Sequence, residues 1–309
     1  MRCAKVIGRT GPAAAGAQYI CKCALAYILG AHPPRHPFFL SLLRVSVTGV
    51  FTTFCLLSCF DVTFAATTNF AAKRERKEVA IEKPLSTLTV GEKLVFGVYW
   101  MGIYVGDGTL EVKEKVIVRG REAFHVVATA KTNDFLTKIY PIYDELHSFI
   151  DAEKFCSLEF RRNVREGRYR ADETVIYDYE KKKAFYESAL NKSKKEADLP
   201  AEVHDPLSAF YWFRLQEIKS KDSLRTVVNS REKNVDLEIQ ILGQQTKELK
   251  GKRVIETVLV EPKTRYKDVL ADRGRAWVYF GVDSRRVPVW ITIKSPFGTV
   301  NGVLKTDQH

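Results

Sequence analysis

The stretch GEKLVFGVYWMGIYVGDGTLEV, residues 91–112, decides the fold. Apolar residues alternate in it with polar or small ones on both sides of a connection rich in glycine. Alternation with a period of two places successive side chains on opposite faces of a β-strand. The glycines of GIYVGDG precede a strand pattern and open no helix, so they predict a tight turn between two antiparallel strands.

The same alternation continues along the rest of the chain after Pro84. A meander of about thirteen strands with short connections must curl or split. No strand–helix–strand rhythm occurs, which argues against a doubly wound fold. We therefore predict a mainly β fold, a single strongly curved antiparallel sheet that is half-barrel-like. The further strand segments include AFHVVATAKT, ELHSFID, SLEFRRNVRE, YRADETVIYDYE, NVDLEIQILG, RVIETVLVEP, RAWVYFGV and VPVWITIK.

Two short segments break the strand pattern and predict helices. The first, near residues 133–140, begins with Asn133 as a capping residue. The second, near residues 205–217, begins with Asp205 as N-cap and Pro206 as first helical residue. Its body is apolar nearly all round, so it needs contacts on every side. We expect both helices to pack on the concave face of the sheet.

The N-terminal region differs in composition from the rest of the chain. An apolar run from Val45 to Phe60 follows basic residues and precedes a small-residue site that ends at Ala65, the order found in a secretory signal. The run begins unusually far from the first residue for a signal peptide. We therefore interpret residues 1–65 as a mis-assigned translation start, upstream of the true one, followed by a signal peptide. Cleavage after Ala65 would release the protein, cleavage after Ser58 would leave Cys59 for lipidation, and an uncleaved segment would anchor it in the membrane.

Residues 66–83 mix alternating charges with small residues and predict a solvated linker before a β domain at 84–309. Export predicts a periplasmic location, where nucleic acid is a poor partner despite the net charge of +12. Cys156 is the only cysteine of the β domain, so we expect no internal disulfide. Its apolar neighbours predict a buried, unreactive thiol.

Several motifs in the same order resemble the bacterial family of exported proteins catalogued as domain of unknown function 3108, over Lys93 to Leu304. That family has no established activity, so the resemblance implies an exported β protein and no reaction. In outline, the predicted sheet with helices is also similar to periplasmic lipoprotein carriers, whose half-open barrels shelter acyl chains. The motifs are GEKLVFGVYWMGIYVGDGTLEV, FLTKIYPIYDELHSFID, REGRYRADETVIYD, DPLSAFYWFR, VEPK and VPVWITIKSPFGTVNGVL.

Glu145 and His147 form the best candidate for chemistry, because they share one face of a predicted strand. Two ligands are too few for a metal site, and a solvated strand face explains the pair better than a metal or acid/base site does. The neighbours His204 and Asp205 are explained by the helix cap. The basic run Arg161–Arg170 either meets phosphates of lipid head groups or keeps an edge hairpin soluble. We predict no catalytic residue, metal or cofactor, since nucleophile elbows, Cys-x-x-Cys pairs and phosphate loops do not occur.

The leading hypothesis is a non-enzymatic envelope protein that binds an apolar or amphipathic ligand, such as a lipid, or a partner protein in the periplasm. One alternative is a structural or assembly factor that acts through its surface; another is a metal-dependent enzyme that uses Glu145 and His147. An open apolar interior favours ligand carriage, and a filled one favours the structural role. The residues predicted to line the ligand site or its lid are Phe135, Leu136, Ile139, Tyr211 and Trp212.

Overall fold

The computed structural model describes part of the chain. The predicted signal peptide, the alternative cleavage sites at Cys59 and Ala65 and most of the predicted linker lie outside it. The described residues are 80–219, 222–230, 233–249, 251–266, 269–270, 274–295 and 298–308.

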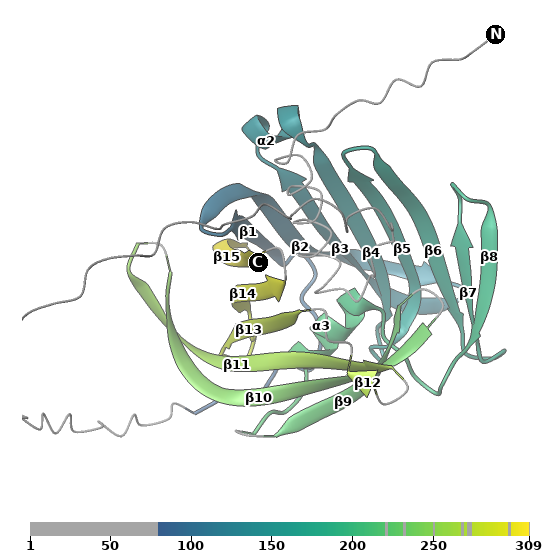
Figure 1. The fold of residues 1–309 in the computed structure, drawn as a ribbon. Helices are drawn as coiled ribbons and strands as arrows, with labels where there is room; N and C mark the ends of the chain where they lie inside the picture. Colours follow the sequence, from purple (N-terminus) through teal and green to yellow (C-terminus); the bar gives the residue numbers. More distant parts are fainter. Residues whose placement is uncertain are drawn as a thin grey trace, which may run out of the picture. The chain divides into compact units, whose positions relative to one another are not determined.

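The described residues form a mainly β fold with a single antiparallel sheet, which confirms the predicted class. The sheet is not closed into a barrel, because its pairing path ends at β8 on one side and at β9 on the other. Figure 1 shows the strands curving around helix α3. The strands are β1 (Lys93–Trp100), β2 (Ile103–Val118), β3 (Arg121–Thr132), β4 (Ile142–Asp151), β5 (Ser157–Glu166), β6 (Tyr169–Asp178), β7 (Lys183–Ser188), β8 (Ser193–Asp198), β9 (Ser223–Ser230), β10 (Lys233–Leu249), β11 (Arg253–Tyr266), β12 (Val269–Leu270), β13 (Arg275–Gly281), β14 (Pro288–Ser295) and β15 (Gly298–Gln308).

The sheet consists of two meanders, in each of which neighbouring strands follow one another in the sequence, and the two meanders meet in the middle of the sheet. From one edge the strand order reads β8-β7-β6-β5-β4-β3-β2-β1 and continues β15-β14-β13-β11-β10-β9, while the short β12 pairs with β11 off this path. The first strand, β1, therefore pairs with the last, β15, in antiparallel register from Lys93↔Gln308 to Trp100↔Val300. This pairing joins the two meanders into one sheet.

The glycines of the opening stretch have two different roles. Gly102, with φ of +86°, occupies the connection between β1 and β2, a backbone conformation that glycine adopts without steric cost. Gly106 and Gly108 lie inside β2 instead, opposite Val98 and Phe96 of β1. The predicted tight turn is thus right for Gly102 and wrong for the other two.

Helix α3 (Pro206–Arg214) lies against the face of the sheet that we call the inner face, as expected. Leu207 and Tyr211 pack into one core cluster, formed mainly with β2–β7. Ala209 and Phe213 pack into a second cluster, formed with β1, β10, β11 and β13–β15. Phe210 lies against both clusters. A helix that is apolar nearly all round therefore finds apolar partners on its several sides, which explains its composition.

Helix α2 (Asp134–Ile139) differs from the expectation that it packs on the concave face. The Asn133 side chain caps it by accepting a hydrogen bond from the Leu136 N–H at 2.9 Å, as predicted, but none of its residues is buried. The helix connects β3 to β4, which pair directly with each other, so it lies beyond the ends of these two strands. Figure 1 shows α2 at the ends of these two strands, away from α3.

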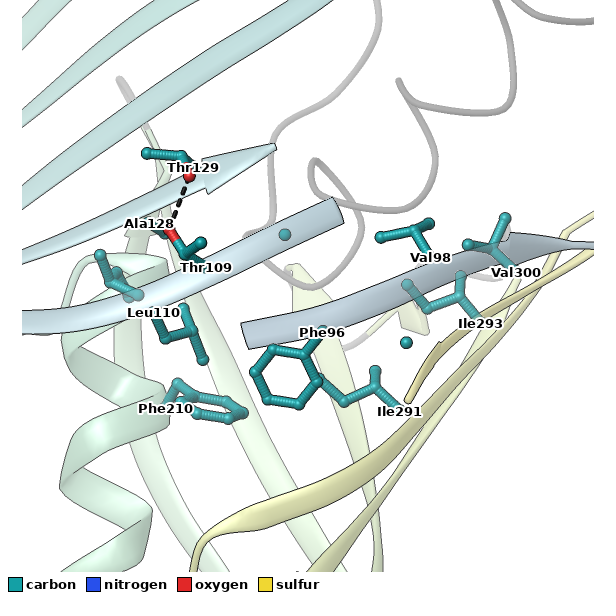
Figure 2. A pocket seen from close by; sticks show the side chains of 13 residues that line it. Phe96, Val98, Thr109, Leu110, Ala128, Thr129, Phe210, Ile291, Ile293 and Val300 are labelled. Atoms are coloured by element: carbon teal, nitrogen blue, oxygen red, sulfur yellow. Dashed lines mark hydrogen bonds between the residues drawn. The ribbon is translucent and has the colours of Figure 1, made fainter. Parts of the chain in front are cut away.

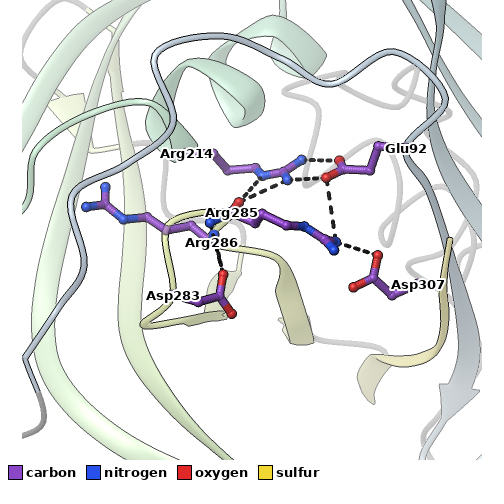
Figure 3. A network of polar contacts seen from close by, with 6 residues as sticks. All are labelled: Glu92, Arg214, Asp283, Arg285, Arg286 and Asp307. Carbon is purple, nitrogen blue, oxygen red and sulfur yellow. Dashed lines mark hydrogen bonds and ion pairs between the residues drawn. The ribbon is translucent and has the colours of Figure 1, made fainter. Parts of the chain in front are cut away.

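The C-terminal end of α3 is held by a buried ion pair (Figure 3). Arg214 Nη1 and Nη2 donate to Glu92 Oε1 and Oε2, both at 2.7 Å, and the two side chains are only 5% and 4% exposed. Arg214 also donates to the carbonyl of Arg285, whose own guanidinium pairs with Asp307. Although burial disfavours the charged guanidinium, its hydrogen bonds to Glu92 raise the pKa of Arg214 above the ordinary value. The pair connects α3 to the residue before β1.

The N-terminal end of α3 is held by the fully buried carboxylate of Asp205. One oxygen accepts the backbone N–H groups of Leu207 and Ser208 at 2.8 and 2.9 Å, which is the predicted N-cap. The other accepts the hydroxyls of Ser148 and Ser157, both at 2.6 Å. Because these serines belong to β4 and β5, the cap also joins the helix to the sheet.

Replacing Arg214 by Met should lower the free energy of unfolding by about 3–5 kcal/mol, because the buried Glu92 carboxylate loses its two short hydrogen bonds and keeps only the more distant Arg285 guanidinium, at 3.9 Å. The double variant Glu92→Leu/Arg214→Met should recover most of this loss, since both fully buried charges are removed and Arg285 keeps its ion pair with Asp307. Denaturant unfolding followed by circular dichroism measures both values. As a control, Arg165→Met removes a more exposed ion pair with Asp172 and should cost less than about 1 kcal/mol. Equal losses for the two single variants would contradict the importance assigned to the buried pair.

Candidate functional site

An apolar pocket lies on the inner face of the sheet, where the two core clusters meet beside α3 (Figure 2). It is partly open and has a volume of about 80 Å³. Its walls come from β1, β2, β3, β14 and β15 and from the first half of α3. The lining residues are Phe96, Val98, Gly108, Thr109, Leu110, Ala128, Thr129, Leu207, Phe210, Ile291, Ile293, Val300 and Gly302.

The pocket exists because small residues interrupt a face that is otherwise filled by large side chains. Gly108 pairs with Phe96, and Gly302 pairs with Ile291, so each glycine lies beside a bulky inner-face residue. A Cβ atom at Gly108 would have its nearest neighbours at 3.5 and 3.8 Å, an ordinary contact distance. A Cβ atom therefore fits at this glycine, which lines the pocket, without displacing its neighbours.

The lining favours hydrocarbon over polar ligands. None of the lining residues carries a charge. The two polar ones, Thr109 and Thr129, pair across β2 and β3, and their hydroxyls are hydrogen-bonded to each other at 2.6 Å. What the pocket offers a ligand is contact with methyl, methylene and aromatic carbon, which is suited to an apolar chain.

The five residues predicted to bind a ligand do not line this pocket. Tyr211 is buried in a core cluster, with its hydroxyl among the buried atoms that have no hydrogen-bond partner. Trp212 is half-buried and lies beside the ring of His204 at 5.3 Å between centroids. Phe135 and Ile139 are exposed on α2, and Leu136 is half-buried. From the predicted helix at 205–217, the residues that do reach the pocket are Leu207 and Phe210.

A family model described as "Protein of unknown function (DUF3108)" matches residues 95–305. The chain belongs to the DUF3108 family. This confirms the family resemblance of the sequence motifs. No curated protein matches the DUF3108 chain.

Three solved structures are similar to the DUF3108 chain. A beta-barrel-like protein of domain of unknown function DUF1849 from Brucella abortus shares 10% identity, with a TM-score of 0.47 over 74% of this chain and 98% of that one. A hypothetical protein from Chlamydia trachomatis shares 11%, with a TM-score of 0.31 over 72% and 87%. A putative exported protein with a YmcC-like fold from Bacteroides fragilis shares 10%, with a TM-score of 0.28 over 75% and 100%.

Glu145 and His147 of the DUF3108 chain do lie together, and the structure adds two further residues to them. His147 Nε2 is 3.3 Å from Glu145 Oε1, and His147 Nδ1 is 3.0 Å from His125 Nε2. His125 Nδ1 in turn is 3.6 Å from Glu114 Oε1. Burial lowers the pKa of both histidines, which favours their neutral forms. Each neutral histidine carries a single ring N–H, so the two rings can donate to only two of the three contacts in this row.

This row lies on the outer face of the sheet, away from α3. His125 is flanked in β3 by Phe124 and Val126, which point into the inner core cluster. Among the described residues there is no group of three or more His, Cys, Asp or Glu side chains that could hold a metal ion. The approach of His125 to His147 cannot be predicted from the sequence, because it depends on the register of β3 against β4, in which Val127 pairs with His147.

The basic run on the β5–β6 hairpin is largely neutralised by carboxylates. Arg168 and Arg170, at and beside the turn, are exposed. The hairpin therefore presents no continuous basic stripe. The ion-paired members of the run are Arg161 with Glu159, Arg162 with Glu173, and Arg165 with Asp172.

His204 and Asp205 do not act as a dyad, as expected from the cap. The Asp205 carboxylate is bonded to the helix N-terminus and to serines. The His204 ring, which is 4% exposed, lies beside Trp212 and has its Nδ1 3.5 Å from Ser208 Oγ. Burial lowers the pKa of His204 to about 4, so the ring is neutral at physiological pH.

No described helix has the length and apolar character that a membrane span requires.

His204 should make the fold sensitive to acid. Its pKa is depressed in the folded state, so the unfolded chain takes up the proton first as the pH falls below about 6.5. The contribution of the neutral His204 ring to the free energy of unfolding is fully present above that pH. It decreases toward pH 4, by up to about 3 kcal/mol. Denaturant unfolding at pH 7.5 and 4.5 should show a smaller loss in His204→Gln than in the wild type. An equal loss in the two proteins would contradict this assignment.

Proposed function

We propose that this DUF3108 protein is a non-enzymatic cell-envelope protein that holds the hydrocarbon part of an amphipathic ligand in the pocket beside α3. The observation that carries the proposal is the gap that Gly108 and Gly302 leave in the inner face. Apolar side chains around an unfilled opening lack van der Waals contacts on one side, and a ligand that fills the opening supplies them. A hydrocarbon chain supplies the missing contacts without any polar group to satisfy.

The size of the pocket narrows the class of ligand. Its volume of about 80 Å³ is well below the roughly 300–1,000 Å³ of pockets that enclose drug-sized molecules. A single slender chain, such as part of an acyl chain, suits this space, and a polar head group would remain outside. The proposed location is the periplasm, on the basis of the signal-like N-terminal sequence.

A second candidate is a structural or assembly factor that acts through its surface. It is favoured by the extent to which α3 and the two core clusters already fill the inner side of the sheet. Under this proposal the pocket is a packing defect with no ligand. The two candidates therefore differ in one measurable property, the lipid content of the purified protein.

Filling the pocket should abolish ligand binding and leave the fold intact. In Gly108→Leu, the new side chain occupies the space in front of the glycine, and leucine is also better suited than glycine to a strand. Mass spectrometry of protein purified without detergent should find bound lipid in the wild type and at least about tenfold less in this variant. Circular dichroism and thermal unfolding establish that the variant is folded.

The matched control is Gly108→Ala, whose single methyl group meets its neighbours at ordinary contact distance and leaves most of the pocket open. It should retain bound lipid at close to the wild-type level. A wild-type protein without any bound lipid, or lipid retained equally in the Leu and Ala variants, would exclude the pocket as a ligand site. The first result would favour the structural or assembly factor.

A further inference from the structure

Several exposed apolar side chains lie close to connections between strands of the sheet. They lie at or near the β1–β2 and β3–β4 connections, and the exposed fraction of each is between 37% and 70%. They make up half of the large hydrophobic residues that are exposed in the described part of the chain. Exposed apolar residues that are concentrated in neighbouring connections indicate an interaction surface. We call this set the apolar rim: Met101, Ile103, Tyr104, Phe135, Ile139 and Tyr143.

Hydrogen bonds join the connections that carry the rim. The Asn133 side chain donates to the Tyr104 carbonyl at 3.0 Å, and its backbone N–H donates to the Val105 carbonyl at 3.0 Å. On the other side of α2, the Gly167 N–H donates to the Pro141 carbonyl at 2.8 Å. The start of β2, helix α2 and the β5–β6 turn therefore lie in a row.

Helix α2 gives little to the stability of the fold. It has no buried residue, yet Phe135 and Ile139, one turn apart on the same helix face, are 70% and 54% exposed. A connection between two neighbouring strands needs only a short turn. The additional helical turn with its two large apolar residues is explained if these side chains contact something outside the chain.

The charges around the rim are mostly positive. Lys131, Lys138, Arg168 and Arg170 are exposed, and the partners of the Arg170 guanidinium among the described residues are the backbone carbonyls of Gly167 and Tyr169. The exposed acid in the same connections is Asp134, at the first turn of α2. Apolar side chains bordered by basic ones match a bilayer surface, where anionic head groups lie above hydrocarbon.

We infer that the apolar rim docks on the surface of an anionic lipid bilayer, with the side chains of α2 and of the β1–β2 connection inserted among the head groups. This function is separate from the pocket, which lies on the inner face of the sheet and shares no residue with the rim. Docking therefore does not depend on the proposed ligand binding.

The test uses the full chain with vesicles of phosphatidylcholine alone or mixed with phosphatidylglycerol. Fluorescence quenching by lipids brominated on their acyl chains reports contact of tryptophan with the bilayer. All four tryptophans belong to the β domain, and Trp100 directly precedes Met101 of the rim, so the signal does not arise from residues 1–79. We expect quenching on the mixed vesicles, less on the neutral ones, a decrease with added salt, and loss of most of the signal in Trp100→Phe.

The double variant Phe135→Ser/Ile139→Ser should require at least about tenfold more lipid for half-maximal quenching. Its matched control is Ile117→Ser/Val254→Ser, because these residues are 71% and 63% exposed but belong to no rim connection. Lys138→Gln/Arg168→Gln should weaken binding to the mixed vesicles only. Wild-type protein that shows no quenching, or equal effects of the two serine pairs, would overturn the inference. So would capture of a protein partner by the rim without any quenching on vesicles.

Discussion

The fold depends on the burial of α3 within the curve of the sheet. The helix is apolar on nearly every side, and two core clusters from different halves of the sheet pack against its alternate residues. Its two ends also contact buried charged groups: the Glu92–Arg214 pair at one end and the Asp205 carboxylate with its serines at the other. Because these charges have specific partners, they determine where along the sheet the helix lies. The apolar contacts alone would permit several positions.

The pocket follows from this placement. Once the helix is held, the distance between its first half and the inner face is set, and side-chain volume decides which parts of the gap are filled. Phe96 and Ile291 fill their parts, whereas Gly108 and Gly302 do not. The same two ends of α3 that stabilise the fold therefore keep the pocket open, because the helix cannot move inward to close it without separating its polar contacts.

The strands, the single antiparallel sheet and both helix caps could be predicted from local sequence, since alternation and capping act within a few residues. The roles of Gly106 and Gly108, the approach of His125 to His147 and the pocket itself could not, because each depends on which residues of neighbouring strands lie opposite each other. The position of α2 was predicted wrongly for a related reason. The apolar residues of α2 predict burial. Because β3 and β4 pair directly with each other, however, α2 lies beyond their ends and none of its residues is buried.

The pairing of β1 with β15 has a consequence for how the chain folds. Most strands of this protein pair with a neighbour in sequence and can form hairpins as soon as that neighbour is available. The centre of the sheet is different, because Lys93 meets Gln308 across nearly the whole β domain. Closing so long a loop is entropically costly and slow, so the two meanders are expected to assemble first and join last. Until the final strand arrives, β1 remains an open edge, and the unfinished protein is most exposed to mispairing there.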